Sequence, residues 1–187
     1  EKFELIYLEH INYFNIKYFK KLCDDTNLKI NKVIFPNYHG KMIRIMISKK
    51  NIKNNYKKII LKENFFFRNT NKLTKFSKNI YKRKSIFLKK IDKILNLGGK
   101  IIAIGASAKT SSLLNFFNLD NNKITFVSDN SAQKIGKFIP NKKIPILKDE
   151  FISKIPNPYI FFSTWNISDF VKKKILNINK KVRIIKY

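Results

Sequence analysis

The chain has 187 residues and a formal net charge of +28, with 40 Lys or Arg against 12 Asp or Glu. Hydrophobic residues make up 44% and include 17 Phe, so a core can be buried and a disordered chain is excluded. The single cysteine, Cys23, excludes an internal disulfide framework or a cysteine-rich zinc site and favours a reducing, cytoplasmic setting. We expect neither a membrane span nor a signal peptide.

Charge alone favours nucleic acid or an anionic membrane surface as the partner. Lys, Asn, Ile and Phe are abundant together, however, while Arg, which reads guanine through paired hydrogen bonds, is scarce. We therefore interpret most of the charge as compositional drift on solvated faces, and expect neither a nucleic acid nor a membrane partner. Polyanion binding by residues 41–100, where Glu63 and Asp92 are the only acidic side chains, stays an alternative.

Residues 1–49 predict mixed structure. In chain order we expect a strand at 3–8, a short helix at 16–25, a strand at 28–35, a turn at 36–40 and a strand at 42–47. Two neighbouring strands joined by a short turn should pair antiparallel.

Residues 50–98 predict a basic helical connector. Apolar side chains recur at steps of three, four or seven, as on one face of a long helix: Leu73, Phe76, Ile80, Phe87, Ile91 and Ile94. Gly98 and Gly99 predict its end. We interpret the stripe as a packing face with lysines on the solvent side, and a polyanion-binding helix as the alternative.

Residues 99–187 alternate between strands and helices. The expected strands are 100–104, 123–127, 159–162 and 182–185, and the expected helices lie near 109–117, 148–154 and 167–176. Such alternation predicts a parallel sheet with right-handed crossovers, and therefore an α/β fold with a small Rossmann-like domain.

The turn after the first of these strands is the most informative segment. The sequence Gly105-Ala106-Ser107-Ala108-Lys109-Thr110 joins a buried strand directly to a helix, and its small residues let the backbone approach a ligand. Lys109 adds a charge and Thr110 a hydroxyl. The turn favours an anionic ligand such as a nucleotide, but its glycine spacing fits neither a P-loop nor a dinucleotide fingerprint.

Other polar residues follow the remaining strands, where open parallel sheets bind their ligands. Asp129 could accept hydrogen bonds from a ribose, and Lys134, in the loop 134–140, could reach a phosphate. Trp165 and Asn166 follow the third strand. Capping or turn chemistry is the alternative for each residue alone, but together they favour a binding site.

The N-terminal part offers Tyr7, Glu9 and His10. A histidine beside a carboxylate and a phenol is a candidate general base with its orienting groups. A surface histidine at the end of a strand is the alternative.

Five motifs follow one another in an order that resembles one known family. Residues 7–14 resemble Tyr-x-Glu-His-x-x-Tyr-Phe, 39–44 resemble His-Gly-Gly-Ser-x-Arg, 105–110 resemble Gly-Ala-Pro-Ala-Lys-Gly, 127–140 resemble Val-Val-Asp followed by Lys-x-Gly-x-x-x-Pro, and 165–166 match Trp-Asn. Together they resemble the C-terminal half of a sugar-nucleotide C-methyltransferase, from the C-methyltransferase C-terminal domain family.

The resemblance implies an organisation and a cofactor. Residues 1–49 would be the end of a class I methyltransferase domain, 50–98 the helical connector and 99–187 the Rossmann-like C-terminal domain. The methyl donor would be S-adenosylmethionine, and we expect its main site, and any zinc site, upstream of Glu1. Because the chain does not start with Met, we expect a fragment that is inactive alone.

The resemblance also implies a mechanism on a nucleotide-linked keto-deoxysugar. His10 would remove a proton next to the ketone, and Glu9 and Tyr7 would orient the imidazole or stabilise the enolate. The implied substrate-binding residues are Ser107, Lys109, Thr110, Asp129, Lys134, Trp165 and Asn166. Lys41 and Met42 replace glycine and serine of the family's turn, which favours a non-enzymatic nucleotide- or partner-binding module as the alternative.

Overall fold

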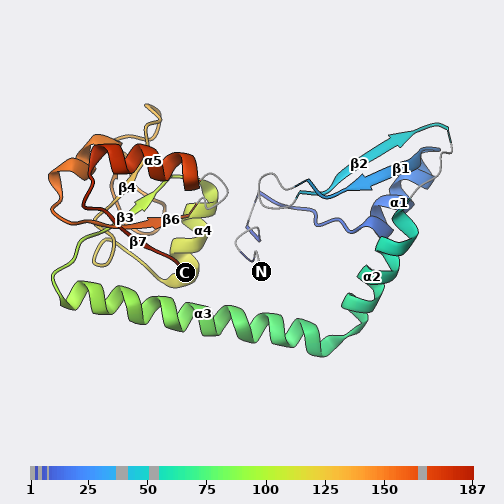
Figure 1. Ribbon diagram of the computed structural model, residues 1–187, viewed down its shortest axis with the longest axis horizontal. Helices are drawn as coiled ribbons and strands as arrows, with labels where there is room; N and C mark the ends of the chain where they lie inside the picture. Colours follow the sequence, from blue (N-terminus) through green and yellow to red (C-terminus); the bar gives the residue numbers. More distant parts are fainter. Residues whose placement is uncertain (1–2, 4–5, 8, 37–41, 51–54, 164–167) are drawn as a thin grey trace. The chain divides into compact units, whose positions relative to one another are not determined.

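The computed structural model describes residues 3, 6, 7, 9–36, 42–50, 55–163 and 168–187. The chain divides into two compact units. We call Glu1–Glu9 with Asn79–Tyr187 the sheet unit, and His10–Lys78 the hairpin unit. Figure 1 shows the elements of both units.

The hairpin unit packs two helices on a two-stranded sheet. Its elements are α1 (Ile16–Asp25), β1 (Lys29–Ile34), β2 (Arg44–Ser48), α2 (Tyr56–Arg68) and the start of α3 (Thr70–Asn96). The strands pair antiparallel, with Val33 opposite Ile45, which confirms the predicted helix and strand pair. Ile16, Cys23, Ile30 and Val33 form its buried core. The predicted turn at 36–40 lies largely outside the described residues.

The strand predicted at residues 3–8 is wrong for the residues described there. The Ile6 N–H donates to the Phe3 carbonyl oxygen at 2.9 Å, which is a local hydrogen bond and not strand pairing, and Tyr7 lies in a bend. The apolar side chain of Phe3 is explained by its burial among aromatic rings, at 8% exposure, so the sequence pattern reflected packing rather than strand pairing.

The predicted connector is two helices, which separate at Asn69. The backbone of Asn69 is extended and its side-chain oxygen accepts from the Lys72 N–H at 3.2 Å, so α3 starts with its own cap. The apolar stripe is buried at Ile80, Phe87 and Ile91. The connector does not form a unit of its own, because α2 belongs to the hairpin unit and most of α3 to the sheet unit.

The sheet unit contains a five-stranded parallel sheet, as predicted for a Rossmann-like α/β domain. Its further elements are β3 (Ile101–Ile104), α4 (Ala108–Phe117), β4 (Phe126–Ser128), β5 (Ile146–Leu147), the 3₁₀ helix η2 (Asp149–Lys154), β6 (Tyr159–Phe162), α5 (Ser168–Ile178) and β7 (Arg183–Ile185). The strand order is β5-β4-β3-β6-β7. The sequence missed β5, which has only two residues, and the helix predicted near 148–154 is the 3₁₀ helix η2.

Side chains from alternate strand positions pack on both faces of the sheet. On one face Ile102, Ile104 and Phe162 meet Ile152 of η2 and Ile175 of α5. On the other, Phe161 of β6 meets Phe87 of α3, with ring centroids 5.1 Å apart. This burial fixes the strand ends that carry the candidate site.

The described residues contain neither a transmembrane helix nor a metal-binding cluster. None of the helices there combines the length and hydropathy that a transmembrane span requires. In the same residues, no group of three or more His, Cys, Asp or Glu side chains is arranged to hold a metal ion.

Candidate functional site

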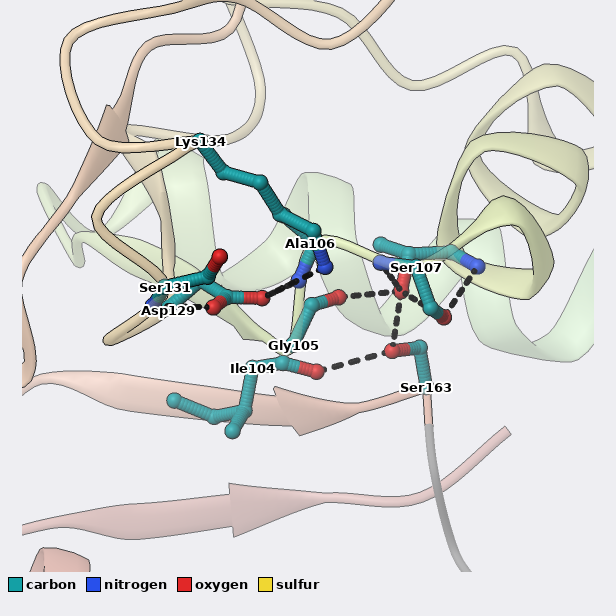
Figure 2. A network of polar contacts seen from close by, with 9 residues as sticks. Ile104, Gly105, Ala106, Ser107, Asp129, Ser131, Lys134 and Ser163 are labelled. Carbon is teal, nitrogen blue, oxygen red and sulfur yellow. Dashed lines mark hydrogen bonds and ion pairs between the residues drawn. The ribbon is translucent and has the colours of Figure 1, made fainter.

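The turn between β3 and α4 is built as the sequence predicted, from a strand end, a glycine and a capped helix. Gly105 has a φ of +86°, in the left-handed region, and its N–H donates to the Ser128 carbonyl oxygen of β4 at 2.8 Å. Ser107 is the N-cap of α4, and its Oγ accepts from the Thr110 N–H at 3.2 Å. Figure 2 shows this turn with its neighbours.

The N-terminus of α4 keeps two open donors. Thr110 N–H binds the Ser107 side chain and Ser111 N–H binds the Ser107 carbonyl oxygen. For the N–H groups of Ala108 and Lys109, the first of the helix, no acceptor is found among the described residues. Because such groups and the helix dipole attract anions, this end of α4 can receive a negatively charged ligand.

The N-terminus of α1 differs from that of α4, because its backbone N–H groups find acceptors within the hairpin unit. The Glu63 carboxylate of α2 accepts from the N–H of Ile16 at 3.0 Å and of Lys17 at 3.3 Å. Asn15 accepts from Tyr18 N–H through its side chain and from Phe19 N–H through its carbonyl. All four first donors of α1 are therefore used, whereas two of α4 are open.

Asp129 braces the turn from the neighbouring strand. One carboxylate oxygen accepts from the Ala106 N–H and the other from the Ser131 N–H, each at 2.8 Å (Figure 2). The Lys134 ammonium lies 3.5 Å from the first oxygen. The side chain of Asp129 is 16% exposed, so it joins the turn to the loop after β4 and still reaches the surface.

Buried hydroxyls support the turn from below. Ser163, at the end of β6, donates to the Ile104 carbonyl oxygen at 2.8 Å, and its Oγ lies 2.6 Å from the Thr110 hydroxyl oxygen. The Thr110 hydroxyl donates its one hydrogen to the Gly105 carbonyl oxygen, so Ser107 must donate in its 3.1 Å contact with Thr110. Thr110 is fully buried, and a contact with substrate would require the turn to open.

A second carboxylate at this edge, Asp149, escaped the sequence reasoning because it follows the undetected strand β5. It accepts hydrogen bonds from the Ser128 hydroxyl, from Asn130 at 2.7 Å and from the Lys174 ammonium of α5 at 2.8 Å. Burial acts to raise the pKa of Asp149, but the hydrogen bonds from Lys174 and Ser128 outweigh it and hold the pKa below its usual value. Asp149 thus ties α5 and η2 to the end of β4.

The remaining predicted residues are placed as follows. Lys109 is half-buried in the first turn of α4. Tyr7, half-buried, and Glu9, exposed, belong to the sheet unit, whereas the exposed His10 belongs to the hairpin unit, where its ring lies 6.3 Å from that of Tyr13. Trp165 and Asn166, like Lys41, lie outside the described residues. The structure thus brings together Ser107, Lys109, Thr110, Asp129 and Lys134.

The opposite, amino edge of the sheet carries a polar recess of about 370 Å³. It is lined by Leu95, Gly98, Gly99, Lys100, Asn121, Asn122, Lys123 and Thr125. The ammonium of Lys123 is already paired with Asp92 at 2.8 Å. Because ligands of open α/β sheets bind at the carboxyl edge, we do not place the candidate site in this recess.

A parallel sheet with a tight glycine turn and an open helix N-terminus at its carboxyl edge defines a Rossmann-like domain of the ligand-binding kind. The family model described as the C-methyltransferase C-terminal domain matches residues 37–185, and the chain belongs to this family. Membership supports a C-methyltransferase. The match begins after residues 7–14 and therefore does not include Tyr7, Glu9 or His10. No curated protein matches the chain.

Proposed function

We propose that the chain is part of an S-adenosylmethionine-dependent C-methyltransferase that acts on a nucleotide-linked keto-deoxysugar. The observation that carries the proposal is the open N-terminus of α4 at the carboxyl edge of the sheet, with the Lys109 side chain in the same helical turn. Two backbone donors, the helix dipole and one ammonium suit the diphosphate of a sugar nucleotide.

In this proposal some residues of the turn bind the ligand and others stabilise the turn. The N–H groups of Ala108 and Lys109 and the Lys109 ammonium bind phosphate, while Ser107 and Thr110 hold the turn in shape, since their hydroxyls are engaged with each other. The Asp129 oxygen that binds Ser131 keeps a second lone pair for a ribose hydroxyl. Lys134 adds positive charge at the same edge. Trp165 and Asn166 would complete the site from the end of β6.

We further propose His10 as the general base. A ketone acidifies the neighbouring C–H bond, so an imidazole nitrogen can accept the proton while the bonding electrons move onto the ketone oxygen as an enolate. Tyr7 and Glu9 would orient the imidazole or stabilise that oxygen. The nucleophilic carbon then forms its bond to the methyl group.

S-adenosylmethionine would supply this methyl group when bound, because its S–CH3 bond would break with both electrons staying on the sulfur, which would leave as a neutral thioether. Among the described residues of the hairpin unit, no glycine-rich turn joins a strand to a helix as such a cofactor requires. We propose that the main site of this cofactor lies outside the described residues. The buried thiol of Cys23 suits the reducing, cytoplasmic setting that we propose.

Two substitutions test the proposal in the intact enzyme. Lys109→Ala should weaken the affinity for the sugar nucleotide at least ~10-fold, because a charge-assisted hydrogen bond is lost. Lys100→Ala, at the amino edge, is the matched control and should leave the affinity unchanged. His10→Asn should lower turnover by ~100-fold or more. Unchanged affinity in Lys109→Ala would remove the phosphate role, and normal turnover in His10→Asn would remove the base.

A further inference from the structure

Phe3 is buried in a cluster of six aromatic rings in the sheet unit. We define the aromatic cluster as Phe3, Phe87, Phe116, Phe117, Phe161 and Tyr187. The ring of Phe3 lies 5.0 Å from that of Phe116 and 6.3 Å from that of Tyr187, and only 8% of Phe3 is exposed. The start of the chain is therefore held on this unit by a specific contact.

The other rings of the aromatic cluster are held by buried helices and a strand of the sheet unit. Phe87 of α3 contacts Phe117 of α4 at 4.7 Å and Phe161 of β6 at 5.1 Å between ring centroids, and all three side chains are fully buried. Lys84 of α3 lies 4.6 Å over the Phe116 ring from outside. The rings that Phe3 contacts, Phe116, Phe117 and Tyr187, therefore pack in turn on buried side chains of α3 and β6, which leaves Phe3 little freedom to shift.

The aromatic cluster and the open N–H groups lie at opposite ends of α4. The aromatic pair Phe116 and Phe117 lies at its C-terminal end, and the open N–H groups of Ala108 and Lys109 lie at its N-terminal end. A ten-residue helix is rigid over its length of about 15 Å. The helix therefore connects the aromatic cluster that contains Phe3 to the proposed phosphate site.

Tyr7 and Glu9 follow Phe3 within six residues, and the sheet unit includes them. The Ile6 N–H donates to the Phe3 carbonyl oxygen at 2.9 Å, which ties the backbone of Ile6 to that of the buried Phe3. Ile6 itself is exposed, so Phe3 is the buried apolar side chain among the residues described in this stretch.

We propose that Phe3 is a positioning residue for the reaction. By seating the N-terminal segment against α4, it fixes Tyr7 and Glu9 relative to a phosphate bound at the other end of the same helix. The inference rests on the proposed function, since it assumes that this segment takes part in catalysis.

The test compares Phe3→Ala, the conservative variant Phe3→Leu and the control Phe170→Ala, whose side chain is 77% exposed in α5. Hydrogen exchange, measured without substrate, should rise at the Ile6 amide in Phe3→Ala, because this N–H donates to the Phe3 carbonyl oxygen, while β3 and α4 stay protected. In the intact enzyme, kcat should fall at least ~10-fold, with KM for the sugar nucleotide changed less than ~3-fold, because misplacement of catalytic groups acts on the chemical step. Phe3→Leu should restore most of kcat, and Phe170→Ala should match the wild type.

Two results would overturn the inference. Unchanged exchange of the Ile6 amide in Phe3→Ala would show that Phe3 does not hold the segment, and increased exchange with unchanged kcat would show that holding it does not matter for the reaction. His10→Asn, assayed in parallel, separates this failure from that of the proposed function. If His10→Asn is inactive while Phe3→Ala turns over normally, only the positioning role is lost.

Discussion

Asp129 holds two backbone N–H groups at once, one from the turn after β3 and one from its own loop. Its position beyond β4 could be predicted from the strand pattern, because a parallel strand brings its carboxyl end to the ligand edge. Its partners could not be predicted, since the approach of Ala106 depends on how two separate loops fold. Ala106 is buried, so its N–H depends on this carboxylate.

We predict that Asp129→Ala destabilises the sheet unit. Leaving the buried Ala106 N–H without an acceptor should lower the free energy of unfolding by about 1–3 kcal/mol. Urea denaturation at neutral pH measures this loss. The exposed Glu150→Ala serves as the control and should stay near the wild type. Equal stability of both variants would contradict the bracing role of Asp129.

Asp149 makes stability depend on pH. Its pKa is lower in the folded chain than in the unfolded chain, where the pKa of an aspartate carboxyl is about 4. A lowered pKa means that the stabilisation is complete above the unfolded value and is lost as the pH falls through the folded value.

We predict that the stability difference between the wild type and Asp149→Asn is largest at neutral pH, on the order of 1–3 kcal/mol, and narrows below about pH 4. Urea denaturation from pH 3 to pH 7 measures it. A difference that is constant over this range would exclude the ionised Asp149 as its source.

At the scale of elements, helices α1 and α4 begin differently. The first four N–H groups of α1 all have internal acceptors, whereas in α4 only the third and fourth have one among the described residues. Glu63 makes this difference, since its carboxylate reaches from α2 to the N-terminus of α1. It also places a negative charge where the helix dipole is positive.

We predict that Glu63→Ala destabilises the hairpin unit by about 1–2 kcal/mol, as other losses of helix caps do. Glu63→Gln keeps an acceptor without the charge and should lie between the two. The exposed Asp25→Ala is the control. Thermal unfolding checks the order, and a Glu63→Ala protein as stable as the control would show that this cap contributes nothing.

Some elements could be predicted from the sequence and others could not. Buried apolar runs identified β3 and β6, and the apolar stripe identified most of α3. The two residues of β5 are too few for any pattern, so Asp149 was missed with it. The strand expected at residues 3–8 is wrong because an apolar side chain indicates that a residue is buried, but not whether it packs in a sheet or among other side chains.

At the scale of the whole molecule, the order of the motifs pointed to the family that residues 37–185 match. The sequence also predicted most of the sheet edge that gathers Ser107, Lys109, Asp129 and Lys134. It could not show that Thr110 lies inside the turn or that Phe3 belongs to the sheet unit. Both facts depend on contacts between residues far apart in the chain.

The central claim is that the start of α4 binds the diphosphate of a sugar nucleotide. The most direct test is a titration of the isotopically labelled chain with UDP, followed by backbone amide NMR at about 0.15 M salt, where weak contacts with exposed lysines are screened. We predict saturable shifts at Ala108 and Lys109 that weaken in Lys109→Ala. Shifts confined to the amino-edge recess around Lys100 and Asn122, or no saturable shift at all, would contradict the claim.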